Sequence, residues 1–279
     1  MSFLSTETGN YKSRIARAES LASRYAFAAE ALSFYVAVAR FQGDVYERLP
    51  KLWGKQPRVT ADGDLRAELN LPILLDPFRQ FLSLVESQGP RPLAAEAHAL
   101  AQGSDEAWAE LLEAFWKNRM TQAPEREAGD PLAEFVARAF LLPYAEFLVN
   151  GMLPPALPMV TCRCPRCNSL PLLGVLRPEG DGGKRYLLCS FCSQEWEFRR
   201  IFCAQCGEET EQNLPVYVAE QFPHIRVECC DTCKHFLRTV DLTKDGNAVP
   251  VVDDLAAIPL SLWADENGYG RIQVNLFGT

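Results

Sequence analysis

All ten cysteines of this 279-residue chain lie between positions 162 and 233, and eight of them form four Cys-x-x-Cys pairs. The pairs join Cys164 to Cys167, Cys189 to Cys192, Cys203 to Cys206, and Cys230 to Cys233. Two thiolates with two residues between them can bind one metal ion from a tight turn, and a second such pair completes a tetrahedron. The pattern therefore predicts two tetrathiolate metal sites, formed by the first two pairs and by the last two.

The spacing of the pairs supports this prediction. Cys164 and Cys203 are 39 positions apart, and Cys189 and Cys230 are 41 apart, so a unit of about 40 residues repeats. A linker of roughly 20 residues between two pairs is typical of zinc sites. A unit this small has little core, so the metal must supply much of its folding free energy. The main alternative is that the pairs perform redox catalysis.

The sequence leaves the identity of the metal open, because tetrahedral all-sulfur sites bind zinc and also iron, as in rubredoxins. Cys162 and Cys229 lie beside the pairs but outside the pattern. Small buried or half-exposed thiols are the favoured interpretation for both, over a role as alternative ligands. His235 is close to the last pair, but four cysteines already complete that site. No motif surrounds His98 or His224.

Charge and hydropathy exclude several classes of protein. The net charge is -8, and the residues from position 160 onward include 12 basic and 16 acidic side chains, which disfavours a nucleic-acid partner. The N-terminus has no secretory signal, and the most apolar segment, residues 135–149, is too short to span a bilayer. We therefore expect a soluble, cytoplasmic protein without membrane insertion. In a reducing compartment, clustered cysteine pairs bind metal or do redox chemistry.

Residues 1–158 are expected to form an all-helical domain, since apolar residues recur there at helical spacing. Pro50 should close the second helix, and Pro143 should kink or split the last one. The aromatic stripes are interpreted as helical core rather than as a ligand pocket. No phosphate-binding loop or nucleophile motif occurs in this half, so no catalytic residue is predicted. The expected helices are residues 11–25, 27–49, 76–88, 94–101, 104–116 and 132–150.

Beyond the proline-rich stretch 151–158, short β-prone runs alternate with turns, and Gly180-Asp181-Gly182-Gly183 predicts a hairpin. We expect an α+β multidomain protein, in which an all-α domain precedes two tandem rubredoxin-like or zinc-ribbon β domains. The first ribbon spans residues 159–200 and the second 201–245, and a tail, residues 246–279, packs on the other domains. The expected strands are residues 170–176, 186–188, 195–198, 216–218 and 236–240.

The cysteine block and the tail resemble the FdhE proteins, the formate dehydrogenase accessory proteins of bacteria. The resemblance covers most of residues 160–279, and the helical half shares mainly its size, its helicity and the segment 140–144. The matching motifs are Cys164-Pro165-Arg166-Cys167-Asn168-Ser169-Leu170-Pro171, Arg185-Tyr186-Leu187-Leu188-Cys189-Ser190-Phe191-Cys192, Glu195-Trp196, Cys203-Ala204-Gln205-Cys206, Glu228-Cys229-Cys230-Asp231-Thr232-Cys233, Asp253-Asp254-Leu255-Ala256 and Asn275-Leu276-Phe277-Gly278.

The resemblance implies a non-enzymatic maturation factor of the cytoplasm. Such a protein contacts the catalytic subunit of a respiratory formate dehydrogenase before twin-arginine export, and binds iron in rubredoxin-like sites. The resemblance also implies that all eight paired cysteines are metal ligands. A redox or electron-transfer protein that uses the same sites is the alternative. The sequence leaves open the oligomeric state and the partner surface, for which the negative face, the helical domain and aromatics such as Trp263 and Tyr269 are candidates.

Overall fold

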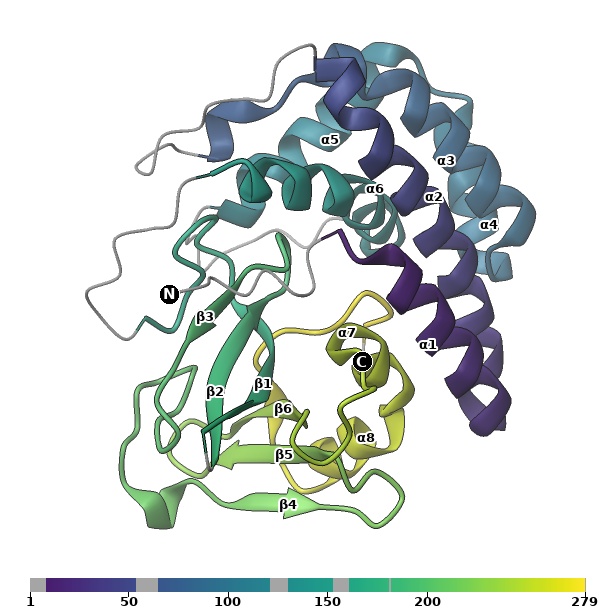
Figure 1. Cartoon of the computed structure of the whole chain (residues 1–279). Helices are drawn as coiled ribbons and strands as arrows, with labels where there is room; N and C mark the ends of the chain where they lie inside the picture. Colours follow the sequence, from purple (N-terminus) through teal and green to yellow (C-terminus); the bar gives the residue numbers. More distant parts are fainter. Residues whose placement is uncertain (1–8, 54–64, 121–129, 153–160, 181, 279) are drawn as a thin grey trace.

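The fold is that of a computed structural model, which describes residues 9–53, 65–120, 130–152, 161–180 and 182–278. Most of the proline-rich stretch 151–158 lies outside the described residues. Helices occupy the N-terminal half and a twisted sheet the C-terminal half (Figure 1). The expected α+β class, with the helices first, is therefore confirmed.

Six α-helices form the N-terminal half of the described chain, and we call them the helical layer. Their starts follow local capping signals at two of the predicted positions. Asp130 accepts a hydrogen bond from the backbone N–H of Leu132, and Ser104 accepts one from that of Ala107. The helices are α1 (Tyr11–Arg24), α2 (Ala29–Trp53), α3 (Leu75–Gln88), α4 (Arg91–Ala101), α5 (Asp105–Met120) and α6 (Pro131–Asn150).

Two prolines lie within helices, although the sequence predicted that Pro50 closes its helix and that Pro143 kinks or splits its own. Pro50 lies in the last turn of α2, which continues to Trp53. Pro143 lies inside α6, which is not split there. A proline leaves the carbonyl of the residue four positions earlier without its helical partner. Here the buried Gln42 side chain donates to that carbonyl, of Ala139, at 2.6 Å, so α2 supplies the missing bond.

Helix α3 begins at Leu75, one residue before the predicted start of this helix at residue 76. Asp76 and Pro77 occupy its first turn, where an acidic side chain and a proline are still well tolerated. The cap position is Leu74, whose side chain makes no capping hydrogen bond. The helix was therefore predicted correctly and its first residue was not.

In the part of the chain that the structure describes, one continuous sheet of seven strands contains both ribbon units. Within each unit the strands are antiparallel, and β1 lies parallel to β6 and joins the two units. The order is β3-β2-β1-β6-β5-β4, and β7 pairs with β6. The strands are β1 (Pro171–Glu179), β2 (Gly182–Cys189), β3 (Glu195–Glu197), β4 (Val216–Val218), β5 (Ile225–Cys230), β6 (His235–Asp241) and β7 (Gly270–Arg271).

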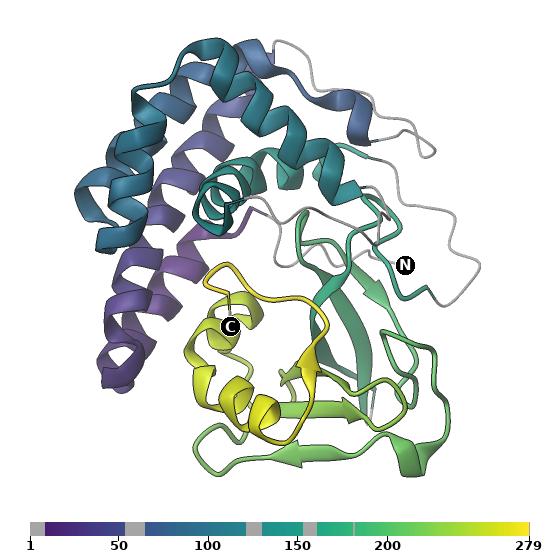
Figure 2. The same cartoon turned by 180° about the vertical axis from the view of Figure 1, so that it is seen from behind.

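The tail contains two helices that the sequence analysis did not predict, α7 (Pro250–Ala256) and α8 (Ile258–Glu266). Figures 1 and 2 show this segment between α1 and the sheet. Its apolar side chains share a core with α1, the first half of α2 and one face of β5 and β6. A second core joins the rest of the helical layer to the first ribbon unit. No described helix has both the length and the apolar character that a membrane span requires.

Candidate metal centres

The eight paired cysteines gather into two groups of four, as the spacing predicted. The first site contains Cys164, Cys167, Cys189 and Cys192, and the second contains Cys203, Cys206, Cys230 and Cys233. Within each group the sulfur atoms all lie within 4.8 Å of one another. Each site therefore takes one pair from each end of its own ribbon unit.

The sulfur–sulfur distances fit a tetrahedral ion. In the first site they are 3.6 Å between Cys164 and Cys192 and 3.3 Å between Cys167 and Cys189. In the second site the closest contacts are 3.7 and 3.8 Å. A metal bound to four sulfurs at about 2.3 Å places those sulfurs about 3.8 Å apart. The donors present thus suit a bound zinc or iron ion, and the distances are far too long for disulfides.

All four Cys-x-x-Cys turns have the same backbone. The residue after the second cysteine has a left-handed conformation in every turn, with φ of 58°, 54°, 80° and 56° at Asn168, Ser193, Gly207 and Lys234. In three turns this residue's N–H donates to the carbonyl of the first cysteine, at 2.8–3.1 Å. Backbone N–H groups inside the first three turns also point at the first sulfur, at 3.4–3.5 Å. Such donors stabilise a thiolate, so the turns are built to hold negatively charged sulfur.

The first site lies inside the molecule, with each of its four cysteines at most 3% exposed. Burial raises the pKa of Cys164 and of Cys192 well above the usual value for a thiol. Burial also opposes ionisation of Cys167, but hydrogen bonds from Cys164 and the other cysteines lower its pKa well below that value. Several buried thiolates need a cation to balance their charge, so metal binding and loss of these protons are coupled.

Helix α6 holds the first site through two buried charged residues. The carboxylate of Glu146, fully buried, accepts from the hydroxyl of Ser193, just after Cys192, at 2.6 Å. It also accepts from the Arg14 guanidinium at 2.7 Å and the Tyr11 hydroxyl at 2.9 Å, both on α1. The carboxylate therefore ties α1 and α6 to the turn that carries two of the four sulfurs.

Arg138 makes the second connection from α6. Its guanidinium donates to the backbone carbonyl of Ser190, inside the Cys189–Cys192 turn, at 3.2 Å. It also donates to the carbonyls of Val274 and Asn275 in the tail, at 3.1 and 2.9 Å. Neither Arg138 nor Glu146 was predicted from the sequence to have a role at the site. Both are charged residues within an apolar helix, where an unpaired buried charge would be costly. That position could have indicated that each has a buried partner.

The second site lies at the surface. Cys230 and Cys203 are buried, whereas Cys206 is exposed and Cys233 is half-buried. Burial raises the pKa of Cys203 to about 11, and hydrogen bonds from the backbone N–H groups of Cys206 and Gln205 partly oppose this effect. Among the described residues, the four cysteines of the first site belong to the apolar core that includes the helical layer, whereas those of the second site do not.

The two remaining cysteines lie outside both groups, which agrees with the favoured interpretation. Cys162 is half-buried, and its sulfur lies 3.8 Å from the carbonyl oxygen of Cys203. Cys229 is buried in the core under the tail, on the opposite face of β5 from Cys230. Burial, followed by the charge of Asp231, raises the pKa of Cys229 to about 12. Neither sulfur belongs to a four-sulfur group.

None of the three histidines is a member of either four-sulfur group. His98 is exposed and lies 2.8 Å from Glu86, and His235 Nδ1 lies 2.7 Å from the carbonyl oxygen of Cys233. His224 is buried and contacts Asp253 at 2.8 Å. Asp245 completes a group that resembles a cation site.

A guanidinium already provides the positive charge in this His224 group. Arg17 of α1 contacts Asp253 at 2.6 Å and Asp245 at 2.8 Å. The group is therefore an ion-pair network, and it links α1 to the tail.

Family models identify the part of the chain that carries both sites. Residues 163–200 match the model "FdhE, central domain", and residues 201–277 match "FdhE, C-terminal domain". Residues 163–277 thus consist of two FdhE-family domains. The boundary between the two models falls just before Cys203, so each FdhE domain contributes its own cysteine pairs.

Comparisons with individual proteins extend this result. The chain is 34% identical over 116 residues to "Protein FdhE homolog" of Aquifex aeolicus, and 36% identical over 121 residues to that of Pseudomonas putida. Each match covers 41% of this chain, and about two fifths of the relative's length (41% and 37%). The crystal structure of the FdhE protein from Pseudomonas aeruginosa has the same fold over nearly the whole chain. It covers 96% of this chain and 95% of its own, with a TM-score of 0.71 and 23% identity.

The structure also explains the two tail motifs of the FdhE resemblance, because they contact each other. The Asn275 amide donates to the carboxylate of Asp254 at 3.0 Å, and this fully buried carboxylate also pairs with Arg238 of β6 at 2.8 Å and Arg271 of β7 at 2.7 Å. Burial opposes ionisation of Asp254, but the two arginines lower its pKa below the usual value. This cluster fixes α7 and β7 against the sheet.

Proposed function

We propose that this chain is an accessory protein for the maturation of a respiratory formate dehydrogenase. It binds the catalytic subunit of that enzyme in the cytoplasm, before twin-arginine export, and catalyses no reaction of its own. The observation that carries the proposal is the pair of closed four-sulfur groups within the FdhE domains. Four thiolates fill a tetrahedral coordination sphere, which leaves no position for a substrate.

In this proposal the eight cysteines are metal ligands, Cys164, Cys167, Cys189 and Cys192 for one ion and Cys203, Cys206, Cys230 and Cys233 for the other. A bound zinc or iron ion would offset part of the negative charge of the thiolates and crosslink the two ends of each ribbon unit. Glu146 and Arg138 then orient the first site against α6. The sites thereby keep the surface of the sheet in one conformation for a protein partner.

The proposal is tested by co-purification from the native organism. A tagged chain expressed at its native level should retain the formate dehydrogenase catalytic subunit, and a deletion strain should lose the formate dehydrogenase activity of the membrane fraction. Complementation with the wild-type gene should restore the activity. Full activity in the deletion strain would contradict the proposal.

The exposure of Cys206 supports a second candidate function, rubredoxin-like electron transfer to the metalloenzyme. A thiolate ligand at the surface gives an iron ion a short path to a redox partner, and the first site has no such path. A reversible change in visible absorption on reduction of natively expressed protein would support this function. Stoichiometric zinc without iron would exclude it, since zinc has no redox chemistry.

A further inference from the structure

Strand β4 forms one outer edge of the sheet, beyond β5 (Figure 1). The backbone N–H of Cys229 donates to the carbonyl of Pro215, and that of Asp231 donates to Asn213. In an antiparallel pair, bonded and non-bonded residues alternate, so Tyr217 bonds to β5 while Val216 and Val218 direct their N–H and C=O groups away from it. The backbone N–H and C=O groups of Val216 and Val218 at the outer edge of β4 are therefore available to pair with an added strand.

The side chains of this edge are apolar and exposed. Val216, Tyr217 and Val218 are 51%, 38% and 55% exposed, and Ile201 in the neighbouring turn is 47% exposed. Tyr217 leans against the ring of Trp263 at 4.6 Å, on the tail side of the sheet. Val216 and Val218 lie on the other side, because side chains alternate along a strand. We call Val216, Val218 and Ile201 the edge patch.

Two aromatic residues named as possible partner contacts lie elsewhere. Tyr269 is buried, and Trp263 is half-buried against Tyr217. Neither residue belongs to the edge patch. The edge patch itself is therefore aliphatic.

A cavity of about 220 Å³ adjoins the edge patch and the second metal site. It lies between the two ribbon units, and Val216 and Ile201 contribute to its lining together with Cys203 and Cys230. Apolar side chains from β1, β6 and the tail, Leu176, Leu237 and Ile272, also line it. This volume suits one apolar side chain presented by a partner.

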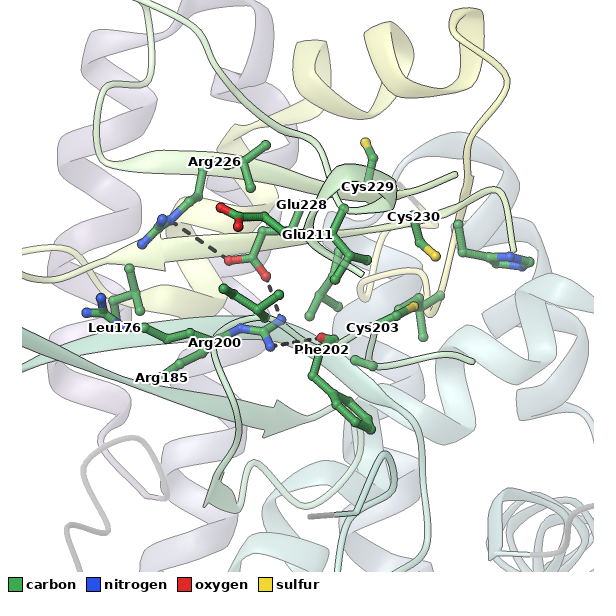
Figure 3. A pocket seen from close by; sticks show the side chains of 17 residues that line it. Leu176, Arg185, Arg200, Phe202, Cys203, Glu211, Arg226, Glu228, Cys229 and Cys230 are labelled. Carbon is green, nitrogen blue, oxygen red and sulfur yellow. Dashed lines mark hydrogen bonds and ion pairs between the residues drawn. The ribbon is translucent and has the colours of Figure 1, made fainter. Parts of the chain in front are cut away.

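The charges at the cavity give the partner a second feature. Figure 3 shows Arg185 and Arg226 approaching the carboxylate of Glu228 from two sides. Arg185 contacts it at 2.5 Å, whereas Arg226 stays 3.9 Å from Glu228 and 3.7 Å from Asp241. Among the described residues, Arg226 makes no side-chain hydrogen bond, and its side chain is 30% exposed. Its guanidinium can therefore bind an additional carboxylate.

We propose that the outer edge of β4 docks one extended segment of the partner, which carries an apolar residue and an acidic residue two positions apart. The apolar side chain enters the cavity beside Val216. The carboxylate lies opposite Val218 and meets Arg226, which is the β5 neighbour of Val218. An added strand lies about 4.8 Å beyond β4, and β4 itself lies between that strand and Arg226 on β5. The arginine side chain and an acidic side chain of the added strand are together long enough to meet across β4. This inference rests on the proposed function, and the segment belongs to the formate dehydrogenase catalytic subunit.

The inference is tested by titrating the purified catalytic subunit against the full-length, metal-loaded chain. Val218→Pro removes an outward N–H that β5 does not use, and Arg226→Glu reverses the charge. Each substitution should weaken binding by at least about tenfold. Phe27→Ser removes an equally exposed apolar side chain from the turn between α1 and α2, so it should bind within about twofold of wild type. Metal content and thermal unfolding must match wild type in all three variants.

Amide hydrogen exchange gives a readout without any substitution. In the complex, the amides of Val216 and Val218 should exchange at least about tenfold more slowly, while that of Tyr217, already bonded to β5, changes little.

The outcomes separate the inference from the function on which it rests. Wild-type binding that Val218→Pro and Arg226→Glu leave intact would overturn the docking edge but not the proposed function. Absence of wild-type binding would overturn the proposed function itself. A wild-type dimer that Val218→Pro converts to monomer would assign the edge to a second copy of this chain and would also overturn the inference.

Discussion

The two four-sulfur sites share one turn geometry and differ in what surrounds them. Every turn places a left-handed residue after its second cysteine. Yet the first site is fully buried and receives contacts from Glu146 and Arg138 of α6, while the second exposes Cys206 at the surface. The same local sequence pattern thus produces one internal site and one surface site.

This difference indicates a division of roles. The first site joins the helical layer to the sheet, because its turn 189–192 contacts α6 by hydrogen bonds and α5 through the Phe191 ring. The second site adjoins the open cavity and the edge patch. We therefore expect loss of the first metal to damage the whole fold and loss of the second to damage mainly the partner surface.

Replacing one ligand in each site gives the largest expected effect. Cys192→Ser should lower the free energy of unfolding by at least about 5 kcal/mol, because metal binding counts toward folding and the buried site cannot admit water in its place. Cys206→Ser should lose one metal as well, with a smaller loss of stability. Metal analysis and urea unfolding measure both. Cys162→Ser, outside both sites, should keep two metals, and equal stability losses at the two sites would contradict the division of roles.

One buried carboxylate stabilises the surroundings of each site, Glu146 near the first site and Asp254 near the second. Glu146→Gln should destabilise the protein by about 3–5 kcal/mol, because it leaves the buried Arg14 without its carboxylate. Asp254→Asn should cost a similar amount, because Arg238 and Arg271 lose theirs. Only Asp254→Asn should loosen the second site. Asp254 holds β7 through Arg271, and β7 bonds to the backbone of Lys234 in the last Cys-x-x-Cys turn of that site. Glu113→Gln, which breaks an exposed helix pair, should change stability by less than about 0.5 kcal/mol.

The Asp254 cluster should also be sensitive to acid. The two arginines lower the pKa of Asp254, so its contribution to stability is complete above the unfolded value of about 3.9. The contribution disappears as the pH falls below that value through the lower folded pKa. Urea unfolding at pH 7 and between pH 5 and 3 should show a steeper loss in wild type than in Asp254→Asn. Parallel curves would show that the carboxylate is not stabilised in the folded state.

Metal extraction should distinguish the sites by rate. A chromogenic chelator at neutral pH should remove the second metal at least about tenfold faster than the first, a difference in barrier of about 1.4 kcal/mol. The reason is that a chelator reaches Cys206 without unfolding the protein. The fast phase should be missing in Cys206→Ser. A single phase of two metals in wild type would show that both sites open together.

Gly207 tests the turn geometry with the smallest expected effect. At φ +80°, alanine should cost about 1–2 kcal/mol through backbone strain alone, because its Cβ would meet only Phe202 at an ordinary 3.6 Å. Gly207→Ala should therefore speed loss of the second metal and leave the first unchanged. Gly180→Ala places the same strain in the β1–β2 hairpin, where it should not affect either metal. Equal effects on both metals would contradict this local explanation.

Features that depend on residues close together in the sequence were predicted correctly. The cysteine spacing gave both four-sulfur groups with the correct members, and Asp130 and Ser104 gave two helix starts. The hairpin between β1 and β2 was also predicted. Strand β5 and helices α7 and α8 were missed, because their short apolar runs carry no clear period and gain stability from packing under α1.

The sequence by itself determined the number of four-cysteine groups, the members of each group and the order of helices before sheet, since each depends on residues close together in one unit. Tertiary structure alone decided which site is buried, how β1 and β6 merge the ribbons into one sheet, and how Gln42 keeps α6 intact at Pro143. It also brought Glu146 to Ser193 and Asp254 to Asn275. These contacts join residues far apart in the chain, and a buried charge or carbonyl takes whichever partner the completed fold brings within reach.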